Sequence, residues 1–360
     1  MGEFEFIQRF CTDLGVKGDS VVLGVGDDAA IVDVPADQDL LVSTDTMNVN
    51  QHFYANADPC DLAHKLIHTN VSDIAAMGGQ AKWATVALSL SEMQPEWLEQ
   101  FSSGLNQQAT KLGLAIIGGD TTKGPLSMSL TIMGTVRKGQ GLLRSGAQPN
   151  DIICVTGQLG GAAAGLRVIQ FIRTAAKGSL DKATNGFSDT TATDDQSWIN
   201  QLDKNSIDQL VACLNRPQAQ HAIGSSLADY ASSCIDISDG LAGDLHHILR
   251  ASRVNASLDW EAIPTHTALS LATSLGDDRI KQLALYGGED YQLAFTISAS
   301  RLDEWQRINP ELAPQVTKVG RVGSRLSEHK SAQQPLNKVK LTLERDDTSV
   351  ELDPYAYQHF

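Results

Sequence analysis

The sequence lacks the marks of a membrane-spanning or disulfide-stabilised protein. It contains no run of 18 apolar residues, so we expect no transmembrane helix. Residues 1–13 mix acidic and apolar side chains without a basic start or an apolar stretch, and we expect no signal peptide there. The five cysteines are odd in number and form no Cys-x-x-Cys pair, which favours reduced, buried thiols. These absences together predict a cytoplasmic protein.

Positive charge is also scarce. The chain has 28 lysine and arginine residues against 43 aspartate and glutamate residues, which gives a net charge of −15. This balance argues against binding to nucleic acid or to an anionic membrane, because proteins that do so normally carry a basic face. If the substrates are anions, some group other than lysine and arginine must neutralise them.

Familiar phosphate-binding patterns are missing as well. No Gly-x-x-x-x-Gly-Lys-Ser/Thr pattern occurs, so the chain is not a P-loop enzyme. The glycine-rich segment 157–161 follows an apolar run and opens a predicted helix, where backbone amides can bind an anion. Close packing of that helix explains the same glycines equally well, and the Gly-x-Gly-x-x-Gly nucleotide pattern is absent there.

The length of 360 residues predicts two domains. Apolar runs typical of short strands alternate with helical segments in both halves, so the fold class is mixed α/β or α+β. The connecting stretch is rich in Gly, Arg, Ser, Pro and Asn, and we place an N-terminal domain at 1–137, a linker at 138–150 and a C-terminal domain at 151–360. Residues 174–206 are polar and poor in large apolar side chains, so we expect a flexible surface insertion there.

Aspartates recur at the ends of short apolar runs. One such aspartate means little, since aspartate commonly caps helices and begins turns. Their repetition, mostly beside Gly, Ser or Thr, favours ion binding, because small neighbours leave room for ions and for close backbone approach. The aspartates concerned are Asp27 and Asp28, Asp45, Asp120, and Asp236 with Asp239.

A further aspartate, Asp73, is singled out by helical geometry. Residues 61–77 predict a helix, and at 100° per residue Asn70 and Asp73 fall inside its apolar arc. A carboxylate there needs a partner, because an unpaired buried charge is very costly. A salt bridge or a cap to another element is one explanation. We favour a metal site shared with the other aspartates.

The chemistry of these ligands indicates which metal to expect. The carboxylates are accompanied by the hydroxyl groups of Ser43 and Thr44, and no histidine–cysteine cluster joins them. Hard oxygen ligands suit Mg²⁺, or Mn²⁺ as a substitute, over zinc or copper. Mg²⁺ is usually held by a few carboxylates together with substrate phosphates, so several such ions would neutralise anionic substrates in an acidic protein.

The ordered set of motifs resembles the thiamine-monophosphate kinase family. Single motifs are shared with the wider aminoimidazole-ribonucleotide-synthetase-like superfamily, whereas the whole set is specific to this kinase. The resemblance runs from about residue 3 to residues 357–360 and fails only over about 174–206. The motifs are GVGDDAAIV (24–32), STDTMNVNQHF (43–53), NVSDIAAMGG (70–79), GGDTTKGPLSMSLTIMG (118–134), RSGAQPND (144–151), IDISDGLAGDL (235–245) and YGGEDYQLAFT (286–296).

The resemblance implies a fold and a set of site residues. The fold would be the two-domain α/β architecture of that superfamily, with an N-terminal sheet that pairs across a homodimer. The resemblance favours Asp28 over the adjacent Asp27, which points the other way on an extended segment. The implied Mg²⁺ ligands are Asp28, Ser43, Thr44, Asp45, Asp73, Asp120, Asp236 and Asp239. The implied ATP contacts are Gly119, Asp120, Arg144 and Ser238, and the implied thiamine-phosphate contacts are His52, Glu289 and Tyr357.

The implied reaction transfers a phosphoryl group from ATP to thiamine monophosphate and yields thiamine diphosphate and ADP. The second pKa of a phosphate monoester is about 6, so the acceptor oxygen is largely ionised near pH 7 and no general base is needed. Several Mg²⁺ ions would position the two anions for direct in-line transfer without a phosphoenzyme.

Two other functions remain open at this point. Within the superfamily, the chain could be an ATP-dependent enzyme that activates a carbonyl or amide oxygen. A selenophosphate synthetase is disfavoured, since Cys11 lies in RFCTDL and not in a glycine-rich loop. From a different class, the chain could be a nucleotide-binding module without catalysis, although the intact aspartate set argues against this because such a module needs fewer metals. An assay for the diphosphate product separates all three.

Overall fold

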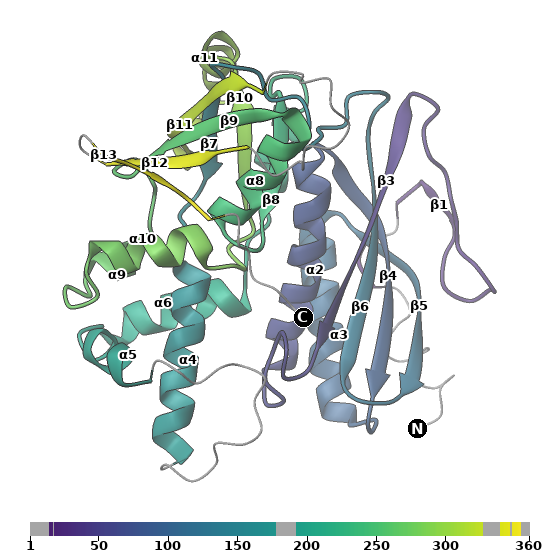
Figure 1. Cartoon of the computed structure of the whole chain (residues 1–360). Helices are drawn as coiled ribbons and strands as arrows, with labels where there is room; N and C mark the ends of the chain where they lie inside the picture. Colours follow the sequence, from purple (N-terminus) through teal and green to yellow (C-terminus); the bar gives the residue numbers. More distant parts are fainter. Residues whose placement is uncertain (1–13, 17, 178–191, 327–338, 346–347, 354–360) are drawn as a thin grey trace, which may run out of the picture. The chain divides into compact units, whose positions relative to one another are not determined.

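The computed structural model describes residues 14–16, 18–177, 192–326, 339–345 and 348–353. These residues form two compact units, each with its own sheet (Figure 1). Unit 1 comprises the described residues up to 75 together with 79–141, and unit 2 comprises 76–78, 142–177 and the described residues from 192 onward. The chain passes between the units after residue 141, within the stretch that the sequence marks as a linker.

Unit 1 is built on a four-stranded sheet with the strand order β3-β6-β4-β5. The strands are β3 (Gln38–Asn48), β4 (Gln80–Leu90), β5 (Ala115–Lys123) and β6 (Ser127–Arg137). β6 pairs antiparallel with β3 and β4, whereas β4 and β5 are parallel. That parallel pair needs a crossover connection, which α3 (Pro95–Leu112) supplies.

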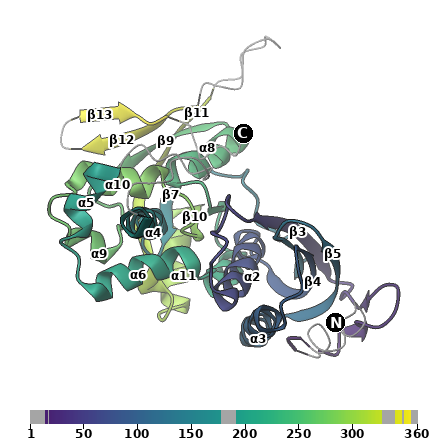
Figure 2. The same ribbon diagram turned by 90° about the horizontal axis from the view of Figure 1, so that it is seen from below.

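The two faces of this sheet are covered differently. α2 (Pro59–Ala76) and α3 lie against one face (Figure 2). On the other face, Trp83 and its buried neighbours pack against apolar side chains of residues 16–34, which include β1 (Val21–Leu23) and β2 (Ile31–Val32). That cover does not extend to the outer side of β3, where Leu40 is 44% exposed and Val42 is 59% exposed.

Unit 2 contains a seven-stranded sheet with the order β13-β12-β9-β11-β7-β10-β8. All neighbouring pairs are antiparallel except β12 and β9. The strands are β7 (Ile152–Thr156), β8 (Ser233–Ile237), β9 (Val254–Asp259), β10 (Gln292–Ile297), β11 (Val316–Arg325), β12 (Leu341–Arg345) and β13 (Thr348–Glu351).

Two helical groups complete unit 2. α8 and α10 pack on the sheet in one buried apolar cluster, and α4, α5, α6 and α9 contribute to a second. The longer helices are α4 (Gly161–Lys177), α5 (Ala192–Ile199), α6 (Lys204–Asn215), α8 (Leu241–Ser252), α10 (Asp277–Tyr286) and α11 (Ala299–Ile308). The shorter ones are α7 (His221–Leu227), α9 (Thr267–Ser270) and the 3-10 helix η2 (Ala313–Gln315).

The structure differs from the expectation of a flexible surface insertion at 174–206. α4 continues to Lys177, and residues 192–199 form α5. Trp198 is 1% exposed and Ile199 3% exposed, and both belong to the second apolar cluster. The expectation is therefore wrong for residues 192–206, because the polar average over the window conceals Trp198, Ile199 and Leu202, which are all buried in that cluster. Residues 178–191 lie outside the described residues.

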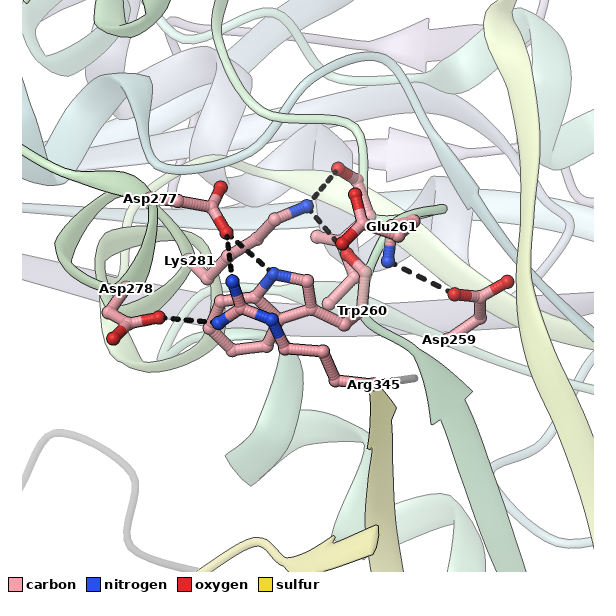
Figure 3. Close-up of polar contacts among 8 residues, drawn as sticks. Asp259, Trp260, Glu261, Asp277, Asp278, Lys281 and Arg345 are labelled. Carbon is pink, nitrogen blue, oxygen red and sulfur yellow. Dashed lines mark hydrogen bonds and ion pairs between the residues drawn. The ribbon is translucent and has the colours of Figure 1, made fainter. Parts of the chain in front are cut away.

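A polar and aromatic contact network ties the end of β12 to α10 within unit 2 (Figure 3). The Arg345 guanidinium lies 4.7 Å from the centre of the Trp260 ring. Trp260 Nε1 donates to Asp277 Oδ2 at 2.7 Å, and Arg345 donates to Asp278 Oδ1 at 2.7 Å. The buried Lys281 ammonium donates to the Trp260 carbonyl oxygen at 2.6 Å. The polar groups of these residues are bonded to one another, so we interpret the network as a structural one that stabilises the C-terminal strands.

Two further findings bear on the sequence expectations. No helix among the described residues is long and apolar enough to cross a membrane. The four described cysteines are free thiols, and Cys154 and Cys234 are buried.

Candidate functional site

A polar cluster lies between β3 and α2 in unit 1, and we call it the β3–α2 cluster. It consists of Ser43, Asp45, Asn70 and Asp73. Successive side chains of a strand alternate between the faces of a sheet, so Ser43 and Asp45 point together toward α2. Ser43 Oγ donates to Asp73 Oδ2 at 2.6 Å, and the Asp45 backbone amide donates to Asn70 Oδ1 at 3.1 Å. The geometric expectation that Asp73 faces inward is thus met by its contact with β3.

Asn70 fixes the orientation of this cluster. Its side chain is fully buried, and its Nδ2 donates to the Leu66 carbonyl oxygen at 2.8 Å. That bond leaves Oδ1 directed at the Asp45 amide. The opposite side of α2 is buried too, since His64, Lys65 and His68 are at most 7% exposed. The helix is therefore enclosed on nearly all sides, and its apolar arc alone does not mark which residues are buried.

The two carboxylates of the cluster are electrostatically coupled. Burial, and to a smaller extent the neighbouring negative charge of Asp73, together raise the pKa of Asp45 to about 6. Two half-buried carboxylates that disfavour each other's ionised forms, with a hydroxyl group beside them, are the hard oxygen donors that a divalent cation prefers. The donor set of the β3–α2 cluster therefore fits Mg²⁺.

Thr44 does not join Ser43 and Asp45. It points to the opposite face of β3, where its hydroxyl group lies 2.8 Å from that of Thr131. The Thr44 hydroxyl group therefore does not lie beside that of Ser43, because neighbouring residues of a strand face opposite ways, and its role as a ligand stays a prediction.

The other aspartates of unit 1 that the sequence singled out are exposed. Asp28 and Asp120 both lie at the surface, and the Asp28 amide donates to Asp27 Oδ1 at 2.8 Å within a turn. Close packing explains the glycine at position 119, since a Cβ there would lie 2.0 Å from the Val86 carbonyl oxygen. Among the described residues, no three carboxylate, histidine or cysteine side chains lie close enough together to hold a metal by themselves. Any cation here thus needs ligands from elsewhere, such as substrate phosphates.

A second polar cluster lies in unit 2, where β8 runs into α8. Asp236 lies on β8 and is 7% exposed, and the chain then turns through Ser238 and Asp239. The carboxylate of Asp244 accepts hydrogen bonds from the backbone amides of Ser238 and Asp239, each at 3.0 Å. Burial raises the pKa of Asp244 to about 7, and the nearby positive charge of Arg144 is among the effects that lower it. Asp244 therefore holds Ser238 and Asp239 in place, and Arg144 lies near enough to affect its pKa.

The segment that carries Glu289 packs against this turn. The backbone amides of Glu289 and Tyr291 donate to the carbonyl oxygens of Ser238 and Ile237 at 2.7 and 2.8 Å. Both residues have left-handed backbone angles, with φ of 68° and 48°. Such angles cost an L-residue about 1–2 kcal/mol, so the surrounding structure must enforce them.

The amides at the glycine-rich segment 157–161 do bind a carboxyl group, but it belongs to a side chain of this protein. Asp290 is buried, its Oδ2 accepts from the Gly160 amide at 2.7 Å and its Oδ1 accepts from the Ala162 amide at 3.2 Å. Asp244 and Asp290 were not identified from the sequence. Their partners are main-chain amides, which carry no sequence signal.

The other predicted substrate contacts can be placed only in part. His52 Nδ1 accepts from the Asn48 amide at 3.1 Å and closes the turn after β3, so in the neutral ring the proton lies on Nε2. Tyr357 lies outside the described residues.

Comparisons with known proteins identify the family. Residues 26–136 match the family described as AIR synthase related protein, N-terminal domain. The thiamine-monophosphate kinase of Escherichia coli (strain K12) is 39% identical over 296 residues, which cover 82% of this chain and 82% of that protein. A crystal structure of thiamine-monophosphate kinase from Stenotrophomonas maltophilia K279a is 36% identical, with a TM-score of 0.72, and covers 89% of this chain and 92% of that one. A structure of AaThiL complexed with AMPPCP and TMP is 26% identical, with a TM-score of 0.70, and covers 91% of this chain and 89% of that one. These matches confirm the resemblance and the mixed α/β fold: the chain belongs to the thiamine-monophosphate kinase family.

Proposed function

We propose that this protein transfers the terminal phosphoryl group of ATP to thiamine monophosphate, giving thiamine diphosphate and ADP in the last step of thiamine diphosphate biosynthesis. The observation that carries the proposal is the related structure AaThiL, which is complexed with both AMPPCP and TMP, an ATP analogue and the acceptor. Its chain and this one match over about nine-tenths of their lengths. The named relatives are kinases of the same substrate.

The acidic residues of the two units fit the handling of these anions. We assign Asp45, Asp73 and Ser43 of the β3–α2 cluster, with Asp28 and Asp120, as the residues of unit 1 that would hold Mg²⁺. Asp236 and Asp239 would do so in unit 2. Bound Mg²⁺ supplies charge neutralisation and alignment of the phosphates. Burial raises the pKa of Asp45 in the metal-free protein, which is the expected state of a carboxylate whose counter-ion is a metal.

The remaining site residues are assigned by chemistry. Arg144 supplies a permanent positive charge for the ATP phosphates in a protein with a net charge of −15. Ser238 and Gly119 contribute contacts to ATP. His52 and Glu289 contact thiamine monophosphate, together with Tyr357. Glu289 carries the negative charge that would recognise a cationic ring.

No side chain is assigned as a general base. The acceptor is a phosphate monoester whose second pKa is about 6, so the attacking oxygen is largely ionised near neutral pH. The protein has only to orient the two substrates in line and to exclude water from the transferred group. We therefore propose direct transfer without a phosphoenzyme.

We also propose that the protein is a homodimer that works in the cytoplasm. The outer side of β3 supports the dimer, since Leu40 and Val42 are exposed where the rest of that sheet face is covered. A second copy that pairs with this face would bury both side chains.

The test is a product assay. The protein is incubated with ATP, Mg²⁺ and thiamine monophosphate, and thiamine diphosphate and ADP are quantified by chromatography. Equal amounts of the two products are expected, and γ-labelled ATP alone should leave no stable label on the protein. ADP and free phosphate without thiamine diphosphate would instead favour the activation of a carbonyl or amide oxygen.

A further inference from the structure

Two adjacent carboxylates, Glu289 and Asp290, have opposite environments. Glu289 is partly exposed, whereas Asp290 is 7% exposed. Both oxygens of Asp290 are engaged by the start of α4, where Gly160 and Ala162 donate their backbone amides. Asp290 is thus turned away from solvent and holds the first turn of a 17-residue helix.

The backbone on either side of Asp290 is held by a different element. The amides of Glu289 and Tyr291 donate to the carbonyl oxygens of Ser238 and Ile237. The short segment 286–292 is therefore bonded to α4 through a side chain and to the β8–α8 turn through its main chain. The turn is the one that carries Ser238 and Asp239.

The fit on both sides is close. A Cβ at Gly287 would lie 2.4 Å from Ala163 Cβ of α4, and one at Gly288 would lie 2.3 Å from the Ser238 carbonyl oxygen. Only glycines allow the segment this near to its two neighbours. The left-handed angles of Glu289 and Tyr291 flank Asp290 directly, so the direction of the Glu289 side chain depends on whether Asp290 stays bound to α4.

We propose that Asp290 is a positioning residue for thiamine monophosphate recognition: by anchoring segment 286–292 to the start of α4, it holds Glu289 in the conformation that contacts the substrate. The inference rests on the proposed function, because it takes Glu289 as a substrate contact. Asp290 itself touches no substrate, since its two oxygens are occupied and its side chain is buried. A residue that only capped α4 would affect stability but not the affinity for one substrate.

The first test is Asp290→Asn, which keeps the volume but replaces one acceptor oxygen by a donor that faces backbone amides. One lost buried hydrogen bond predicts a rise in the KM for thiamine monophosphate of about tenfold, with kcat and the KM for ATP changed less than about threefold. Asp303→Asn is the matched control, because Asp303 is exposed on α11 of the same unit and should leave all three constants unchanged.

A double-mutant cycle with Glu289→Gln distinguishes positioning from a general structural role. If Asp290 acts through Glu289, adding Asp290→Asn to the Glu289→Gln variant changes the KM for thiamine monophosphate little. An equal factor in both backgrounds would overturn the inference. A wild type that makes thiamine diphosphate while neither single variant changes that KM would overturn it too, and would leave the proposed function intact. A wild type that makes no thiamine diphosphate would instead refute the proposed function.

Amide hydrogen exchange without substrates gives a readout that does not need activity. In the wild type, the amides of Gly160, Ala162, Glu289 and Tyr291 should be protected to an extent similar to those of β10. In Asp290→Asn, peptides that span 157–163 and 286–293 should exchange faster, while β10 and the exposed-control variant do not change. Unprotected amides at these positions in the wild type would overturn the inference even if the variant fails to fold.

Discussion

Replacing Asp73 with asparagine removes one negative charge from the β3–α2 cluster and keeps the shape of the side chain. The amide oxygen of asparagine can still accept the bond that Ser43 Oγ donates to Asp73 Oδ2 at 2.6 Å. In the metal-free protein, the change relieves the repulsion that contributes to raising the pKa of Asp45 to about 6. One pKa unit corresponds to about 1.4 kcal/mol, so the metal-free variant should match the wild type or exceed its stability by about 1 kcal/mol.

With ligands the expected order is reversed. Kinase activity of Asp73→Asn should fall by a factor of about 10² or more, because metal charge stabilisation is worth several kcal/mol. Mg-ATP at 100 times its Kd should stabilise the wild type by about 2.7 kcal/mol and the variant much less. Thermal melts with and without Mg-ATP measure both effects, and Glu99→Gln on the exposed side of α3 is the control for a lost charge.

The refuting result is specific. If Asp73 were the partner of a buried cation, Asp73→Asn would strand that cation and cost about 3–5 kcal/mol without metal. A strongly destabilised metal-free variant that still responds fully to Mg-ATP would therefore refute the assignment of Asp73 as a metal ligand.

Three further predictions follow from the geometry. Ser43→Ala should lower kinase activity by about tenfold or more, whereas Thr44→Val should keep it within about threefold, because only the Ser43 side chain lies in the β3–α2 cluster. Equal losses of activity in kinetic assays of the two variants would contradict this prediction. Trp198→Ala should lower the free energy of unfolding by about 3–5 kcal/mol in urea titrations, since Trp198 is 1% exposed; a loss below about 1 kcal/mol would restore the view of 192–206 as a surface insertion. Burial raises the pKa of Asp290 to about 7 from the 3.8 of an ordinary aspartate, so the folded state binds the proton more tightly than the unfolded state. The contribution of Asp290 to stability should thus be highest below about pH 4 and decrease as the pH rises to about 7. Across that window, the free energy of unfolding of the wild type minus that of Asp290→Asn should fall by on the order of 1–4 kcal/mol. A difference that does not change with pH in metal-free urea titrations would contradict the raised pKa.

The sequence was most informative where a residue's place depends on local geometry alone. The helical period put Asp73 on the side of α2 that meets β3, and the contact with Ser43 has that direction. The same alternation rule could have separated Thr44 from Ser43, because neighbouring strand residues face opposite ways. The resemblance implied both Ser43 and Thr44 as ligands but did not indicate which way their side chains point.

The sequence was least informative where a residue acts on distant main-chain groups. Asp244 binds amides five and six positions away, but Asp290 binds an amide 130 positions away. Residues of almost every type carry a backbone amide, so the sequence does not show which amide a carboxylate binds. Trp198 was missed for a different reason, since the polar average of its surroundings hid an apolar side of α5.

The 130 positions between Gly160 and Asp290 also set an order of events during synthesis. Ribosomes add about 5–20 residues per second, so the first turn of α4 waits on the order of ten seconds for its capping carboxylate. The interior strand β7 waits as well, since its two neighbours in the sheet, β10 and β11, are both made later. The helix of the newly made chain therefore stays uncapped until residue 290 has left the ribosome, and β7 stays unpaired until β10 follows. We expect this interval to be when the protein depends most on chaperones, and a pause in translation before that codon would lengthen it.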